Sequence, residues 1–101
     1  MSEIVDDAAD ERLYAEIDGE TAELFYEVDG DDLIIIHTEV PTALEGHGVG
    51  SQLVQAALDR ARRDGLAVVP WCPFARRWMR GHPDALEGIT VDWKRPPPEH
   101  G

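Results

Sequence analysis

Lysine, cysteine and long apolar runs are scarce in this 101-residue sequence, and each shortage excludes a class of protein. The 9 basic residues include one lysine, Lys94, and they face 21 acidic residues, so the formal net charge at pH 7 is −12. Nucleic acid is therefore not an expected partner, because phosphates are bound by clustered lysine and arginine. No apolar run reaches the length of a membrane-spanning helix, and the length suits one domain over residues 1–101.

Cysteine is represented by Cys72 alone. An internal disulfide is excluded, and because no cysteine or histidine stands at ligand spacing from Cys72, we expect no metal site. The opening residues MSEIVDDAADE lack the basic start and apolar stretch of a secretory signal, so a cytoplasmic location is expected. We expect the proline-rich residues 95–101 to form a loose tail.

Acidic residues are concentrated in the first half. Residues 1–45 hold 15 of them with one base, whereas residues 46–101 hold 6 with 8 bases. A solvated acidic surface explains this pattern, and attraction of a cationic ligand is a second explanation that the sequence leaves open.

The periodicity of apolar residues predicts an α/β (α+β) fold with a mixed sheet. Residues 12–17 and 23–28 alternate as half-buried strands, and Asp18-Gly19 and Asp29-Gly30 are predicted as the hairpin turns. A buried strand over 32–40, an amphipathic helix over 49–63 and a strand over 66–71 then form a right-handed parallel β-α-β unit. A second helix over 73–81 and a last short strand after residue 88 complete the prediction.

Between Gly46 and Leu58 the sequence has no aspartate or glutamate. Gly46, Gly48 and Gly50 stand where this stretch opens a helix, so backbone N–H groups can gather around an anion at the helix N-terminus. A plain tight turn would use the same glycines, but the missing acid and the flanking strands favour a bound phosphate. No Gly-Lys-Ser/Thr follows, and the spacing is not that of the dinucleotide fingerprint, so both of those loops are excluded.

The stretch Glu45-Gly46-His47-Gly48-Val49-Gly50 resembles the acetyl-CoA signature Gln/Arg-x-x-Gly-x-Gly/Ala of the GNAT acetyltransferase superfamily. Four motifs in order, HTEV, the glycine loop, Cys-Pro and His-Pro, resemble its short Yjdj-type branch over about residues 33–84. This resemblance implies an N-acetyltransferase that moves an acetyl group from acetyl-CoA to an amine. The acidic first half favours a cationic acceptor.

The resemblance also implies the cofactor site. Acetyl-CoA would lie between two splayed parallel strands, with its pantetheine along the backbone near Glu39 and Val40. Its pyrophosphate would lie on a set of loop residues: Glu45, Gly46, His47, Gly48, Val49, Gly50 and Ser51. Glu45 departs from the family's glutamine or arginine, and the family's tyrosine after His-Pro is replaced here by Asp84-Ala85.

Cys72, His37 and Glu39 are the candidate catalytic residues. Cys72 precedes Pro73 at the start of a predicted helix, where the dipole stabilises negative charge, and the family resemblance implies a catalytic cysteine. It would act as nucleophile or as the acid that protonates departing CoA thiolate. His37 or Glu39 would accept a proton from the ammonium, although each also suits a structural role.

Two rival functions stay open at this stage. A CoA-binding module without turnover is compatible with Glu45 and the missing tyrosine, and a protein-interaction domain would bind no CoA.

Overall fold

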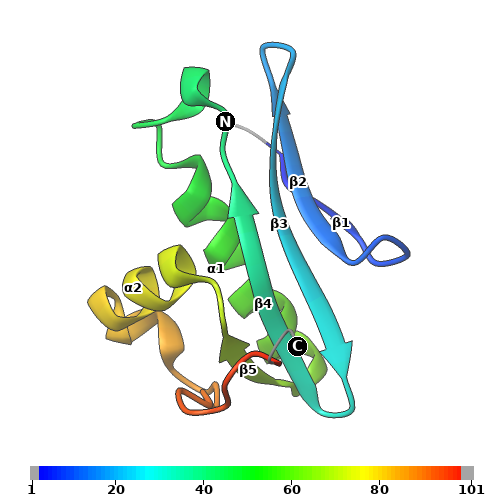
Figure 1. Ribbon diagram of the computed structural model, residues 1–101, viewed down its shortest axis with the longest axis vertical. Helices are drawn as coiled ribbons and strands as arrows, with labels where there is room; N and C mark the ends of the chain where they lie inside the picture. The colour runs from blue at the N-terminus through cyan, green and yellow to red at the C-terminus, as the bar shows by residue number, and fades with distance from the viewer. Residues whose placement is uncertain (1–2, 99–101) are drawn as a thin grey trace.

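The computed structural model describes residues 3–98, which form a five-stranded sheet with two α-helices (Figure 1). In chain order the elements are β1 (Val5–Asp7), β2 (Arg12–Ile17), β3 (Glu20–Asp29), β4 (Asp32–Glu39), the 3-10 helix η1 (Thr42–Leu44), α1 (Val49–Asp64), β5 (Ala67–Pro70), α2 (Pro73–Gly81) and the 3-10 helix η2 (Pro83–Leu86). The sheet order is β1-β2-β3-β4-β5. Strands β1 to β4 pair antiparallel and β4 pairs parallel with β5, so the predicted meander and β-α-β unit are confirmed.

The hairpin turns follow from backbone conformations that glycine and aspartate tolerate. Asp18 and Gly19 have φ of 51° and 82°, as a two-residue type I′ turn requires. The next hairpin turns at Gly30 and Asp31, one residue later than predicted, because Asp29 pairs with Asp32 across the turn. Gly30, with φ of 60°, supplies the positive angle there.

Strand β1 was not predicted, and a polar cluster attaches it to the rest of the fold. The buried Tyr26 hydroxyl on β3 donates to Asp6 Oδ1 at 2.5 Å, and Arg60 on α1 donates to Asp6 Oδ2 at 2.7 Å and to Tyr26 Oη at 2.8 Å. Burial, followed by the hydrogen bond to Asp6, raises the pKa of Tyr26 to about 12. The cluster therefore joins an edge strand, a central strand and a helix.

The two helices lie on one side of the sheet, which we call the inner face. In Figure 1, α1 crosses behind β4 while α2 lies beside β5. The buried core fills this inner face, and α1 contributes Leu53, Val54, Ala57, Leu58 and Ala61 to it. On the opposite, outer face none of the helices formed by residues 3–98 covers strands β2 to β4. None of the helices within residues 3–98 is long and apolar enough to cross a membrane.

Strand β4 contains one extra residue. Phe25 pairs with His37 but Tyr26 pairs with Ile35, so Ile36 is left without a partner on β3. Such a bulge reverses the alternation of side chains along the rest of the strand. Leu33 and Ile35 therefore belong to the inner-face core, and beyond the bulge the even-numbered positions point inward instead.

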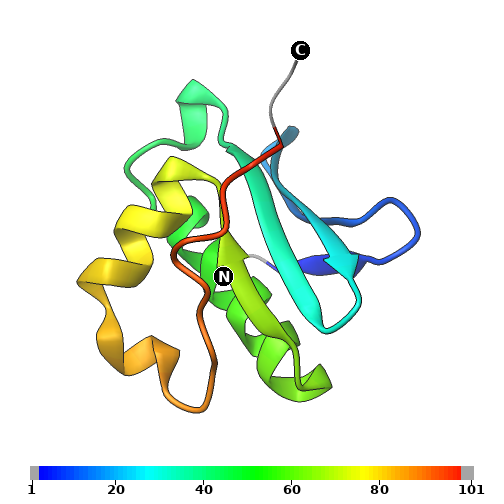
Figure 2. The same ribbon diagram turned by 60° about the horizontal axis from the view of Figure 1, so that its bottom comes forward.

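The segment after η2 returns alongside β5, where residues 90–92 bond to Val68 (Figure 2). The predicted last strand is reduced to a single bridge between Val91 and Val68. Arg95 then forms ion pairs with Asp29 at 3.0 Å and Asp32 at 2.9 Å, and its carbonyl accepts the Trp71 indole N–H at 2.9 Å. The tail predicted over 95–101 thus begins with an anchored residue, and its residues 99–101 lie outside the described part of the chain.

Candidate functional site

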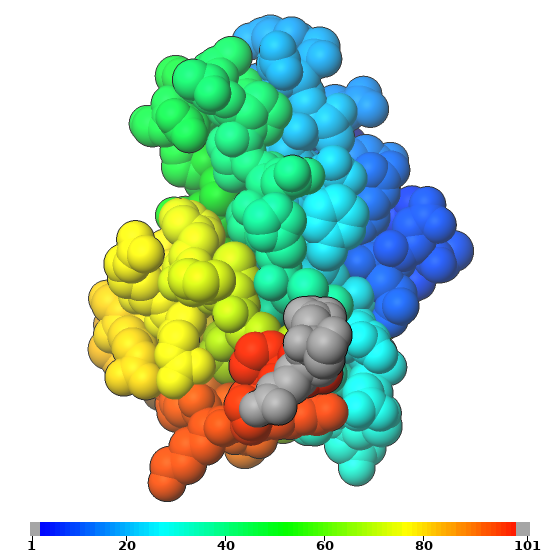
Figure 3. Space-filling view, in the orientation of Figure 1, coloured from blue at the N-terminus to red at the C-terminus, as the bar shows by residue number. Residues whose placement is uncertain are grey.

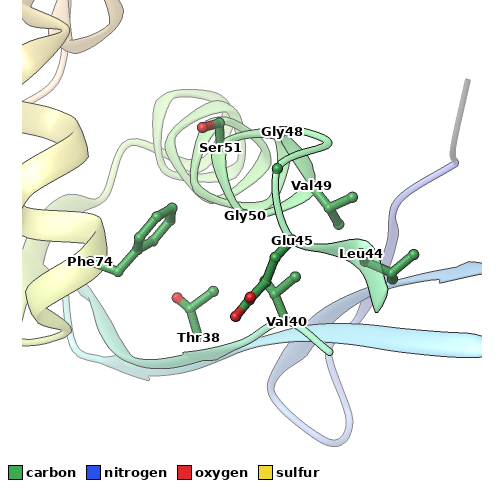
Figure 4. A pocket seen from close by; sticks show the side chains of 10 residues that line it. Thr38, Val40, Leu44, Glu45, Gly48, Val49, Gly50, Ser51 and Phe74 are labelled. Carbon is green, nitrogen blue, oxygen red and sulfur yellow. The ribbon is translucent and has the colours of Figure 1, made fainter. Parts of the chain in front are cut away.

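A cavity of about 460 Å³ lies where β4, the glycine loop and both helices meet (Figure 4). Its walls come from the end of β4, from the loop after it, from the first turn of α1 and from the first turn of α2. The lining residues are Thr38, Val40, Leu44, Glu45, Gly46, Gly48, Val49, Gly50, Ser51 and Phe74. Seven of the eight residues predicted to bind acetyl-CoA are among them.

The glycine loop exposes backbone donors to this cavity. Gly46 and Gly48 have φ of 84° and 75°, angles that other residues rarely adopt, and Gly48 is the left-handed N-cap of α1. The hydrogen bonds of α1 begin with the Gln52 N–H, which donates to the Gly48 carbonyl at 3.0 Å. In the described structure five N–H groups have no protein acceptor, those of Gly46, Gly48, Val49, Gly50 and Ser51.

The electrostatics of the loop suit an anion at one end. The first turn of α1 contains no acidic residue and its N-cap has no side-chain hydrogen bond, so no side chain of the helix itself offsets the positive end of its dipole. One carboxylate opposes this field, because Glu45 lines the cavity and points toward Val40 and Thr38 in Figure 4. The loop thus combines several free N–H donors, which favour a bound anion, with one carboxylate, which repels it.

Gly50 is required for space and not for its φ angle. A Cβ at position 50 would lie 2.8 Å from Phe74 Cζ, 3.0 Å from Phe74 Cε2 and 3.6 Å from Val40 Cγ2. The absent side chain therefore lets the ring of α2 lie directly on the backbone of α1. The Phe74 ring is 39% exposed and forms one wall of the cavity.

Strands β4 and β5 part beside the cavity. Their parallel pairing ends at Ile35 and Pro70, after which the N–H groups of Trp71 and Cys72 both donate to the Ile35 carbonyl at 3.0 Å. Strand β4 continues to Glu39 with β3 as its partner on one side and, within the described residues, no strand on the other. The sheet is therefore open beside residues 36–39.

Cys72 lies at this opening, immediately before α2. Its side chain is 3% exposed and belongs to the core, and its sulfur is 3.4 Å from the Thr38 hydroxyl oxygen, where either atom can donate. Thr38 lines the cavity and Cys72 does not. The Thr38 hydroxyl therefore lies between the thiol and the cavity and links the two by a hydrogen bond.

His37 and Glu39 lie close to each other, as strand alternation predicts, but not in the cavity. His37 Nε2 is 3.8 Å from Glu39 Oε1, the side chains are 58% and 62% exposed, and the His37 ring stacks on Phe25 of the outer face. The bulge at Ile36 is the physical reason, because it turns Thr38 inward and its two neighbours outward. Their catalytic roles stay predictions, and in such a role each side chain would act from the outer face, beside the opening.

His47 is the predicted cofactor residue that lies outside the cavity. It lines an adjoining cavity of about 520 Å³ that shares Leu44 and Val49 with the first. Sequence reasoning in turn missed Thr38, Leu44 and Phe74 among the lining residues. The inward position of Thr38 could not be predicted because of the bulge. Phe74 could have been predicted, because it is the second residue of the helix that follows β5.

Comparisons with known proteins agree with this fold. A family model described as GCN5-related N-acetyl-transferase matches residues 12–88. The NMR solution structure of a "GCN5-like putative N-acetyltransferase" from Staphylococcus aureus superposes with a TM-score of 0.70 at 27% sequence identity, covering 92% of each chain. A search of curated proteins found no match. The family match extends over most of the chain and includes the whole cavity, so this chain belongs to the GCN5-related N-acetyltransferase family, in its short Yjdj-type branch.

Proposed function

We propose that the chain transfers an acetyl group from acetyl-CoA to an amine, with the cavity on the inner face as the acetyl-CoA site. The observation that carries this proposal is the group of five N–H donors at the start of α1, in a cavity lined by the residues that the family motif contains. The family implies acetyl-CoA as the group donor.

The free donors fit a pyrophosphate. N–H groups at a helix N-terminus bind phosphate oxygens by charge-assisted hydrogen bonds, and several act on one group at once. Gly46 and Gly48 hold the loop in the conformation that exposes them, and a side chain at Gly50 would displace the Phe74 ring. Glu45 is the one lining residue that does not fit, because its carboxylate lowers the affinity for an anion.

The unpaired edge of β4 fits the pantetheine arm. Backbone groups of residues 36–39 face the opening where β5 is absent, so they are available to the amide groups of an extended ligand. Val40 lines the cavity at the end of this edge. Its position supports the predicted contact of the residue 39–40 backbone with the arm.

The position of the Cys72 thiol favours direct transfer over an acetyl-cysteine route. The amine nitrogen bonds to the thioester carbonyl carbon and gives up a proton to His37 or Glu39, the carbon–sulfur bond breaks, and the departing CoA sulfur takes up a proton. Thr38 can donate its hydroxyl proton toward the cavity while it accepts one from Cys72, which makes the pair a proton relay. A nucleophilic thiol would instead have to enter a cavity that it does not line.

Intact-mass spectrometry together with an acetylation assay tests the proposal. The native chain and the Cys72→Ala variant are incubated with acetyl-CoA, first without acceptor and then with a panel of amines. We expect retention of CoA under native spray, no 42 Da adduct, which is the mass of one acetyl group, and CoA release that depends on an amine. A labile adduct that vanishes in the variant would replace the relay by the covalent route. Absence of CoA binding would refute the proposal.

A CoA-binding module without turnover is the second candidate, and two observations favour it. Glu45 places a carboxylate in the cavity, and Cys72 is buried behind Thr38. Saturable CoA binding without amine-dependent release, across the whole amine panel, would support this candidate over the enzyme.

A further inference from the structure

The chain continues past residue 88, where the family match ends, and the continuing segment packs on β5 and α2. We call residues 91–95 of this segment the C-terminal clasp. Val91 bridges Val68 of β5, and the N–H of Asp92 donates to the Val68 carbonyl at 2.9 Å. Figure 3 shows the clasp, in orange-red, directly against α2, in yellow. The clasp therefore lies beside the two elements that meet at the opening of the sheet.

Arg76 of α2 joins the clasp to the end of β5. Its guanidinium donates to the Trp93 carbonyl at 2.7 Å and to the Pro70 carbonyl at 3.4 Å. The same group lies 5.7 Å from the centroid of the Trp93 ring. Hydrogen bonds from an ionised donor are stronger than those between neutral groups. One side chain thus connects α2, the last residue of β5 and the clasp.

The turn over residues 70–72 leaves the sheet, because strand pairing between β4 and β5 ends at Ile35. The two N–H groups of this turn share the Ile35 carbonyl, at 3.0 Å each. Two side-chain hydrogen bonds hold the turn as well, one from Arg76 to its first carbonyl and one from the Trp71 indole to the Arg95 carbonyl. The course of the turn therefore depends on α2 and on the clasp as well as on the sheet.

This turn carries the thiol of the proposed relay. The Cys72 sulfur is 3.4 Å from the Thr38 hydroxyl oxygen, and within the described residues it has no other hydrogen-bond partner. The Arg76 N–H donates to the Cys72 carbonyl at 2.9 Å, so the backbone of Arg76 is bonded to the same residue. A shift of the turn would move the sulfur away from Thr38.

Arg76 differs from its neighbour Arg80 in what it contacts. Arg80 lies over the same Trp93 ring, 4.6 Å from the centroid, but in the described structure it donates to no backbone carbonyl. Arg76 has carbonyl oxygens as its partners, and none of the carboxylates within residues 3–98 contacts it. Its hydrogen bonds therefore fix backbone positions and neutralise no acidic side chain.

We propose that Arg76 is a positioning residue of the transfer reaction, which holds the turn over residues 70–72 so that the Cys72 thiol stays against the Thr38 hydroxyl. The C-terminal clasp anchors it through Trp93. This inference rests on the proposed function, because the relay from thiol to hydroxyl is the step that the positioning serves. Arg76 does not line the cavity, so it acts through Cys72. A displacement of about 1 Å in such a group can cost about 100-fold in rate.

Alkylation by iodoacetamide tests the position of the thiol without any need for activity. Cys72 is the only cysteine of the chain, so the rate, followed by intact mass, reports on this side chain alone. The matched control is Arg80→Met, which removes one charge of α2 and one contact with the Trp93 ring but no bond to a carbonyl. We expect alkylation about fivefold faster than native in Arg76→Met and at the native rate in the control. Arg76→Lys keeps the charge without the planar fork, and its rate should lie between native and Arg76→Met.

Steady-state kinetics test whether Arg76 acts through the relay. Arg76→Met should lower kcat about tenfold at unchanged KM for acetyl-CoA, because the glycine loop is not altered. In the Cys72→Val background the same change should lower kcat less than twofold, because the thiol that Arg76 positions is already absent. Circular dichroism confirms that each chain is folded, and if Arg76→Met does not fold, Arg76→Lys takes its place in both experiments.

The outcomes separate the positioning role from the enzyme. Native alkylation in Arg76→Met, or an equal acceleration in Arg80→Met, would refute the positioning role while transfer itself persists. An equal loss of kcat from Arg76→Met in the native and Cys72→Val backgrounds would refute it as well. The expected pattern of alkylation rates without transfer by any chain would support the positioning of the thiol and refute the enzyme.

Discussion

The contact between Gly50 and Phe74 gives a prediction that separates binding from folding. In Gly50→Ala the new Cβ would lie 2.8 Å from Phe74 Cζ, which is closer than carbon atoms approach, so the ring has to move. The ring can move at little cost because it is 39% exposed and is the end of a flexible side chain. Because Phe74 lines the cavity, a displaced ring changes the cavity wall, and we expect affinity for acetyl-CoA to fall about tenfold, which corresponds to about 1.4 kcal/mol.

The effect on stability should be small, because two contributions oppose each other. Alanine in place of glycine inside a helix stabilises by about 0.5–1 kcal/mol. A ring forced about 30° off its rotamer costs about 0.5–1.5 kcal/mol. The net change is therefore within about 1 kcal/mol, which for a domain of this size moves Tm by less than about 8 °C.

A double-mutant cycle tests this reasoning. Phe74→Leu removes the Cζ and Cε2 atoms that the new Cβ would meet, so Gly50→Ala should weaken acetyl-CoA binding in the native background and have little effect in the Phe74→Leu background. Isothermal titration gives the Kd values, and thermal unfolding followed by circular dichroism confirms that all four chains fold. Native affinity in Gly50→Ala, or an equal loss in both backgrounds, would refute the role of this contact.

Three further predictions concern charge, proton transfer and pH. Glu45→Gln should tighten acetyl-CoA binding about threefold, since a carboxylate about 6 Å from a phosphate costs about 0.7 kcal/mol in water, and titration in 0.5 M salt should abolish the gain. Cys72→Val keeps a buried side chain of similar size but no donor, so kcat should fall about 100-fold at unchanged KM for acetyl-CoA; an unchanged kcat would exclude the relay. Tyr26 has a pKa of about 12 against an ordinary 10.0, so the folded chain holds the phenol proton more tightly than the unfolded chain does, and this stabilisation is complete below pH 10 and lost between about pH 10 and 12. Urea unfolding should show that loss in the native chain and a smaller one in Tyr26→Phe, and identical pH profiles would contradict it.

Local sequence signals predicted most of the fold. The alternating strands over 12–17 and 23–28, the Asp18-Gly19 turn and the amphipathic helix all depend on short-range periodicity, and the structure contains each of them. Strand β1 escaped prediction because its three residues, Val5–Asp7, carry no alternation of their own. It depends on the distant Arg60 and Tyr26, which no local pattern reveals.

The sequence marks the glycine loop that forms one wall of the cavity. Glycines at positions that require positive φ, followed by a helix without acid in its first turn, are the signal for the loop that we propose as the pyrophosphate site. The faces of β4 could not be predicted, because the bulge at Ile36 reverses the alternation, and the sequence of the strand does not mark it. Thr38 was therefore overlooked, and the outward position of His37 and Glu39 relative to the cavity could not be foreseen.

NMR can show directly whether the loop before α1 binds the pyrophosphate of acetyl-CoA. A ¹⁵N-labelled chain of 101 residues gives resolved amide signals, which can be followed while acetyl-CoA is added. The largest chemical-shift changes should occur at the five free amides, those of Gly46, Gly48, Val49, Gly50 and Ser51, and the changes should fit one acetyl-CoA site per chain. Unchanged signals for these amides at saturating acetyl-CoA, or shifts confined to another part of the chain, would refute pyrophosphate binding at this loop.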